Sequence, residues 1–118
     1  MLAGTDTGPT MAMMQAVPGF SLHTLLEVLV LQGMTPLEAL QTATINPAEY
    51  LYGLDSLGTI SPGKLADIVL LDANPLTDIY NTRRIRAVVA NGRFFDRGDL
   101  DVMLLDAEQR ARGTRRSP

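Results

Sequence analysis

One stretch decides the fold of this chain: Gly58-Thr59-Ile60-Ser61-Pro62-Gly63-Lys64-Leu65-Ala66-Asp67-Ile68-Val69-Leu70-Leu71-Asp72. Within it the hydrophobic pattern changes from a helical period to an extended one. Residues 65–71 are almost continuously apolar, which is typical of a strand buried on both faces. A Pro-Gly turn signal precedes the run. We therefore predict a strand at 65–71 and a shorter one at 58–60.

The segment that follows reads as a hairpin and a terminal helix. Residues 85–90 have the composition of a second strand, and Asn91-Gly92 is a strong signal for a tight turn before a third. From about Asp99 the apolar residues return to helical spacing, and Gly113 is a suitable terminator. We expect the Arg-rich remainder, 113–118, to be a solvated tail.

The segment before the deciding stretch predicts three helices. The first begins at Ser21 as its N-cap and ends at Gly33. The second has Thr35 as N-cap, proline at the first helical position and glutamate three residues after the cap, which is a capping box. The third opens with a similar pattern at Asn46 and ends near residue 53. Residues 1–6 are compatible with the tail of a buried strand, and residues 7–20 with a long loop.

Composition limits the classes of function. The chain has 118 residues, 46% hydrophobic and 19% charged, as in an ordinary soluble globular protein. Its net charge of −3 gives no reason to expect a nucleic acid or an acidic membrane as partner. It has no cysteine, which excludes disulfides and thiolate metal sites. No signal peptide or membrane span is apparent, so a cytoplasmic protein is expected.

Several motifs together carry a family resemblance, and they include the deciding stretch. The others are Ala3-Gly4-Thr5-Asp6, Pro18-Gly19-Phe20-Ser21-Leu22-His23, Thr35-Pro36-Leu37-Glu38-Ala39-Leu40 and Thr44-Ile45-Asn46-Pro47-Ala48. In this order and spacing they resemble the amidohydrolase superfamily, most closely its imidazolonepropionase-like and Xaa-Pro-dipeptidase-like branch. The resemblance covers roughly residues 2 to 96.

The resemblance implies an α/β fold. In this family a distorted (β/α)8 barrel carries the active site, and a small β-sandwich is built from both ends of the chain. Residues 1–55 would then be the last strand, loop and closing helices of the barrel. Residues 56–97 would be the C-terminal strands of the sandwich, and residues 98–118 a terminal helix and tail.

The resemblance also gives Asp6 a role. It matches the aspartate at the end of the eighth barrel strand, which the family uses to bind metal and to move a proton during attack by metal-activated water. Barrel enzymes do place reactive groups at the C-terminal ends of strands. Taken alone, Gly4-Thr5-Asp6 is better explained as a polar turn, where aspartate is common. With the downstream motifs included, we favour Asp6 as catalytic residue and metal ligand.

Two further polar residues have competing interpretations. His23, the only histidine, is a candidate for binding substrate or for supporting a metal ligand, but it also fits a half-buried helix residue bonded to Glu27 or to a backbone group. Asp67 lies in an apolar run, where capping a sandwich contact explains it more simply than chemistry does.

The ligand count suggests that the chemistry is incomplete within these residues. A catalytic zinc needs about three protein ligands, and the resemblance places the family's His-x-His pair, bridging lysine and later histidines before Met1. We expect the complete enzyme to use a divalent metal, zinc above all, on a small-molecule amide or dipeptide C–N bond. The chain alone should bind no such metal, be inactive and self-associate.

Three hypotheses about the chain remain open. It is a C-terminal fragment of a hydrolase, which we favour, or one subunit of a split enzyme whose other polypeptide supplies the missing ligands. Alternatively, it is a non-catalytic assembly or binding module that reuses the sandwich strands.

Overall fold

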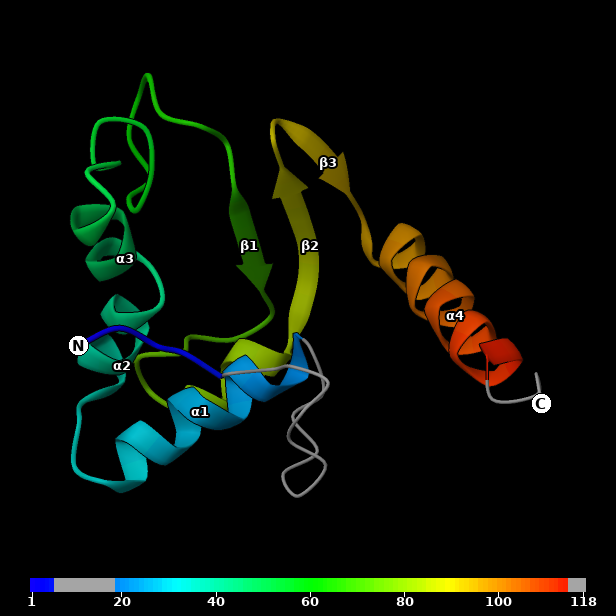
Figure 1. Cartoon of the computed structure of the whole chain (residues 1–118), viewed down its shortest axis with the longest axis horizontal. Helices are drawn as coiled ribbons and strands as arrows, with labels where there is room; N and C mark the ends of the chain where they lie inside the picture. The colour runs from blue at the N-terminus through cyan, green and yellow to red at the C-terminus, as the bar shows by residue number, and fades with distance from the viewer. Residues whose placement is uncertain (6–18, 115–118) are drawn as a thin grey trace.

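The computed structural model describes residues 1–5 and 19–114, and its helices and strands follow one another along an elongated molecule (Figure 1). In chain order they are α1 (Phe20–Leu31), α2 (Pro36–Thr42), α3 (Ile45–Tyr50), β1 (Ile68–Leu71), the 3-10 helix η1 (Ile79–Arg83), β2 (Ile85–Ala90), β3 (Arg93–Phe95) and α4 (Arg97–Thr114). Three helices thus precede a small antiparallel sheet, and a long helix follows it. The predicted loop at 7–20 lies almost wholly outside the described residues.

The first helix begins two residues earlier than predicted. Gly19, with φ of 82°, stands at its N-cap, so Ser21 falls inside the first turn instead of capping it. A φ in the left-handed region is easy for glycine, which explains why the chain enters the helix here. The end agrees with the prediction, because the helix finishes at Leu31 and Gly33 has φ of 107°.

The capping box of α2 is confirmed. The Thr35 hydroxyl accepts a hydrogen bond from the Glu38 backbone N–H at 3.2 Å, and Glu38 Oε2 accepts one from the Thr35 N–H at 2.7 Å. Two hydrogen bonds that the Glu38 carboxylate accepts, first from the Thr35 backbone N–H and then from the Thr35 hydroxyl, lower the pKa of Glu38. The cap predicted at Asn46 is wrong, because α3 begins at Ile45 and the Asn46 amide donates instead to the Met1 carbonyl at 3.0 Å.

The sheet has the order β1-β2-β3, with both pairs antiparallel. The predicted hairpin is confirmed: Ala90 pairs with Arg93, and both turn residues have positive φ, 50° at Asn91 and 77° at Gly92. Two left-handed residues give a turn whose twist matches that of the strands. The side chain of Asp67 ties this turn to β1, because its Oδ1 accepts the Asn91 N–H at 2.6 Å.

Two strand predictions fail. Residues 58–60 form no strand, because Gly58 (φ 87°) turns the chain tightly against α3. The strand predicted at 65–71 is shortened to β1, and it is not buried on both faces, since Val69 is 54% exposed. Residues 1–5 pair as a strand with no other described segment, and the barrel strand expected there stays a prediction. Strands are fixed by their neighbours as much as by their own composition.

The core lies where α1, α2 and η1 meet. Its buried members are Leu26, Ala39 and Ile79, with partly buried side chains of α1 and α2 around them. This is a small core for the length of the chain. Large apolar side chains remain exposed on α1, at the end of α3, on the sheet and on α4.

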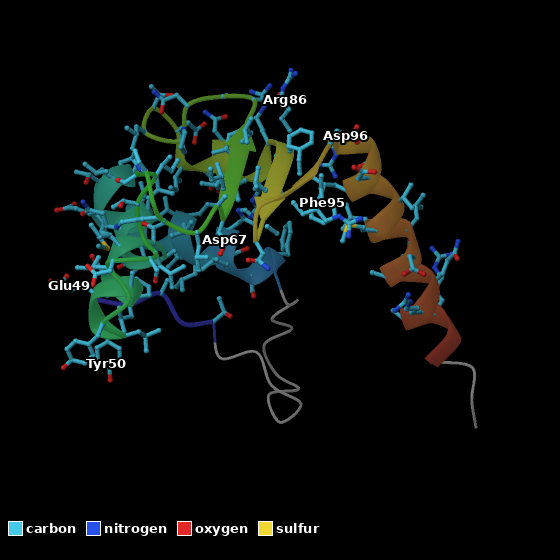
Figure 2. All side chains as sticks on the ribbon, turned by 90° about the horizontal axis from the view of Figure 1, so that it is seen from above. Glu49, Tyr50, Asp67, Arg86, Phe95 and Asp96 are labelled. Carbon is cyan, nitrogen blue, oxygen red and sulfur yellow. The ribbon has the colours of Figure 1, made fainter. Side chains whose placement is uncertain are left out.

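The terminal helix stands apart from that core. α4 begins at Arg97, two residues earlier than predicted, and runs away from the sheet (Figure 1). Figure 2 shows Phe95 and Asp96 at the junction with α4, far from Tyr50 at the other end of the molecule. The radius of gyration is 16.0 Å, against about 13 Å for a compact domain of this length. Among the described residues, no helix is long and apolar enough to cross a membrane.

Candidate functional site

Asp6 lies outside the described residues, but the segment directly before it is anchored. Residues 1–5 run beside α2 (Figure 1). The Ala3 N–H donates to the Thr42 carbonyl at 2.9 Å, and Asn46 holds the Met1 carbonyl. Thr42 is itself buried, at 1% exposure. The two helices α2 and α3 therefore fix the backbone that leads into Asp6.

His23 is placed by a contact between distant parts of the chain. It lies on α1, and its Nδ1 is 3.1 Å from the hydroxyl of Thr82 in η1. That hydroxyl donates its proton to the Ile79 carbonyl at 2.9 Å, so it is free to accept from an Nδ1–H. This arrangement favours the tautomer with a free lone pair on Nε2. Burial first, and then the positive charge of Arg83, lower the pKa of His23, so the ring is neutral at pH 7.

Glu27 does not bond to His23, although the two are one helical turn apart. It is 7% exposed and forms a two-pronged ion pair with Arg83, with Nε–Oε1 and Nη2–Oε2 distances of 2.5 Å and 2.7 Å. The Arg83 guanidinium also lies over the Phe20 ring, 4.5 Å from its centre. We call the pair Glu27–Arg83 the clasp, because it fastens α1 to η1.

The clasp was not predicted from the sequence, although half of its signal is present there. Glu27 interrupts an apolar helical run, and a carboxylate on a buried helix face needs a partner. The partner is 56 residues away in the chain. Three arginines occur within residues 83–86 alone, and helical or strand spacing does not select among them.

The described residues contain no group of three or more His, Asp or Glu side chains that could hold a metal. His23 and Glu27 are the titratable groups near the core, and Glu27 is already occupied by Arg83. Asp67 lies beside the Asn91-Gly92 turn, where its Oδ1 accepts the Asn91 N–H; this supports the structural interpretation. The described part of the chain thus offers one neutral imidazole and an anchored approach to Asp6.

A comparison with protein families shows which family this chain belongs to. The model of the Amidohydrolase family matches residues 1–95. The chain belongs to the amidohydrolase family. The predicted superfamily membership is therefore confirmed, and the match ends just before α4 of this amidohydrolase chain.

Individual relatives agree with the family match. Adenine deaminase 4 of Rhizobium meliloti (strain 1021) is 41% identical over 96 residues, which are 81% of this chain and 15% of that protein. Among solved structures, a molinate hydrolase aligns with a TM-score of 0.66 and 36% identity over 77% of this chain and 20% of its own. A Xaa-Pro dipeptidase with bound methionine aligns with a TM-score of 0.60 and 32% identity over 63% of this chain and 18% of its own.

The same comparisons show how much of each relative's length the chain spans. The amidohydrolase chain spans a fifth or less of the length of each of these three proteins.

Proposed function

We propose that this chain forms the C-terminal part of a metal-dependent hydrolase of C–N bonds, in which Asp6 accepts a proton from the attacking water and later donates it to the leaving nitrogen. The family match over residues 1–95 carries the proposal. The names of the relatives support the bond type, since an adenine deaminase and a Xaa-Pro dipeptidase are among them. A small-molecule amide or a dipeptide is the substrate class.

The metal would be held only in part by this chain. A catalytic zinc generally takes three protein ligands, and the described residues provide no such group. Asp6 would supply one carboxylate, and the remaining ligands would come from a preceding segment or another subunit. A divalent metal, zinc above all, would supply activation of the water at neutral pH.

The chain's own residues have distinct tasks in this proposal. Asp6 accepts a proton from the attacking water and returns it to the leaving nitrogen, as a carboxylate placed beside a hydrolytic water can. The anchored segment 1–5 fixes the direction from which Asp6 enters the site. His23 is neutral and is held through Nδ1 by Thr82. Its Nε2 would accept a hydrogen bond from the substrate or from a residue that binds the metal.

The distribution of apolar surface supports a role as one part of a larger unit. Tyr50, Leu51 and Tyr52 line a shallow depression at the end of α3, beside Met1 and Leu2. All five side chains are exposed, and Tyr52 is 97% exposed. Contiguous apolar surface of this kind marks a contact with other protein. In the proposal, residues 1–55 close a (β/α)8 barrel and residues 56–97 complete a sandwich.

A chimaera tests the function directly. The fifth of molinate hydrolase that this chain matches would be replaced by residues 1–95. We expect a folded protein that binds divalent metal and hydrolyses molinate. A folded, metal-loaded chimaera without turnover would contradict the proposal. A subunit of a split enzyme would instead restore activity when supplied as a separate polypeptide, and a non-catalytic module would do so in neither form.

A further inference from the structure

Helix α4 is an addition to the part of the chain that the family model describes. The match ends at residue 95, and α4 begins at Arg97. The helix is fixed at its first turn, where Arg97 Nη1 donates to the Ile85 carbonyl at 2.8 Å and Asp96 and Asp99 cap each other's backbone N–H groups. Beyond that turn it leaves the body of the molecule (Figure 1).

An apolar stripe runs along α4, from Leu100, which is partly buried in the anchored first turn, to Ala111 in the free part of the helix. At 3.6 residues per turn, five apolar side chains fall on one side of the helix: Leu100, Met103, Leu104, Ala107 and Ala111. Within the stripe, Met103 is 54% and Leu104 is 64% exposed. A helix with such a face is stabilised by covering it.

The charges along α4 point to a second copy of the same helix. Within α4, residues 97–108 contain four carboxylates and one arginine, a net side-chain charge of −3, and residues 109–114 contain two arginines, a net charge of +2. Two copies side by side in the same direction would place like charges together. In the antiparallel arrangement each acidic half lies beside a basic half, which is favourable.

The sizes of the stripe residues favour the same arrangement. The large side chains occupy its first half and the two alanines its second. An antiparallel pair centred between residues 105 and 106 sets Leu100 against Ala111 of the second copy and Leu104 against Ala107. At these two levels large residues face small ones, and Met103 faces Glu108 of the second copy. A parallel pair would set large against large and leave gaps between the alanines.

We propose that α4 is a self-pairing helix, which joins two copies of this chain in an antiparallel, two-fold symmetric contact. On one flank Asp99 approaches Arg110 of the second copy, and on the other flank Asp101 approaches Arg112. The existing pairs within the helix, such as Arg97–Asp101 at 2.9 Å, are exposed. Exposed pairs contribute little, so exchanging them between copies costs little.

Cysteine cross-linking of the full chain tests the direction. The chain has no native cysteine, so each introduced thiol is unique. Leu100→Cys and Ala111→Cys proteins would be mixed and oxidised, and each would be oxidised alone as the control. We expect a disulfide-linked dimer from the mixture and little from either variant alone, because equal positions are about 16 Å apart along an antiparallel pair. Cross-linking of Leu100→Cys with itself would overturn the antiparallel arrangement.

A charge placed in the stripe tests the surface itself. Leu104→Glu should weaken association at least about tenfold, measured by sedimentation velocity. Val102→Glu is the matched control, because Val102 is 65% exposed but lies on the opposite side of α4. Equal effects of the two substitutions, or none from either, would overturn the proposal and assign any remaining association to another surface. Circular dichroism of both variants verifies that α4 is still formed.

Discussion

At the scale of single residues, Asp6 carries the chemistry of the proposed function. In the active chimaera, Asp6→Asn removes the group that takes the proton of water and weakens one metal ligand while keeping the size of the side chain. We expect turnover to fall by about 10²- to 10⁴-fold with the fold intact. Asp67→Asn is the control, because an asparagine oxygen can still accept the Asn91 N–H. Near-native turnover of Asp6→Asn would remove the proton-transfer role.

His23 should make stability depend on pH. Its pKa in the folded chain is lowered from 6.5, by burial first and then by Arg83. Below pH 6.5 the unfolded chain therefore takes up this proton more readily than the folded chain, and the free energy of unfolding decreases. The stabilisation is fully present above pH 6.5 and is lost as the pH falls towards the lowered value. His23→Gln should reduce the dependence of the melting midpoint on pH between pH 7.5 and 5.5. An unchanged slope of midpoint against pH would contradict this.

His23 should also affect turnover less than Asp6 does. Thr82 holds its Nδ1, and the neutral ring contributes no charge to the reaction. In the same chimaera we expect His23→Ala to lower turnover by less than Asp6→Asn, with steady-state kinetics as the measurement. A loss as large as that of Asp6→Asn would place His23 among the reacting groups.

At the scale of elements, the clasp should respond unequally to loss of its two members. Arg83→Ala leaves the buried Glu27 carboxylate without a partner, which should cost about 3 kcal/mol. Glu27→Ala leaves an arginine whose side chain is 34% exposed and can reach water, so about 1 kcal/mol is expected. Arg86→Ala, in an exposed pair with Asp72, should change little. Urea unfolding measures all three, and equal costs for the first two would contradict the asymmetry.

Gly58 should be far less replaceable than Gly63. Both have φ near +87°, but a Cβ on Gly58 would lie 2.7 Å from the Ala48 Cβ, whereas nothing lies within 4 Å of one on Gly63. Gly63→Ala should cost about 1 kcal/mol, for its backbone conformation alone. Gly58→Ala adds the collision with α3, for a total of roughly 2–4 kcal/mol. Urea unfolding of the two variants side by side measures the difference, and similar costs would contradict the close packing.

These elements show what could be predicted from the sequence and what could not. The Thr35 capping box and the Asn91-Gly92 turn are local, because every group they need lies within four residues, and both were predicted correctly. The strand at 58–60 was wrong because Gly58 serves a contact with α3 rather than a sheet. The clasp was missed because it joins residues 56 positions apart. Asp6 was predicted from its motif, and its role stays a prediction.

At the scale of the whole molecule, apolar surface outweighs the core. β1 is an edge strand with Val69 and Leu70 exposed, and unpaired edges pair readily with other chains. We expect the isolated chain to self-associate or to unfold over a broad temperature range, and we expect the same of its Leu104→Glu variant. In the chimaera, where the chain is joined to a barrel, both the association and the broad unfolding should disappear. Light scattering and thermal melting measure both properties. A monodisperse Leu104→Glu monomer with a sharp transition would show a self-sufficient fold.

The clasp also sets an order of events during synthesis. α1 leaves the ribosome long before η1, and its buried carboxylate has no partner until Arg83 has been added. At about 5 to 20 residues per second, a separation of 56 residues corresponds to roughly 3 to 11 s. During this interval Glu27 must stay hydrated, so α1 cannot settle in its final place. The nascent chain therefore keeps its first helix available to other partners until the 3-10 helix has been made.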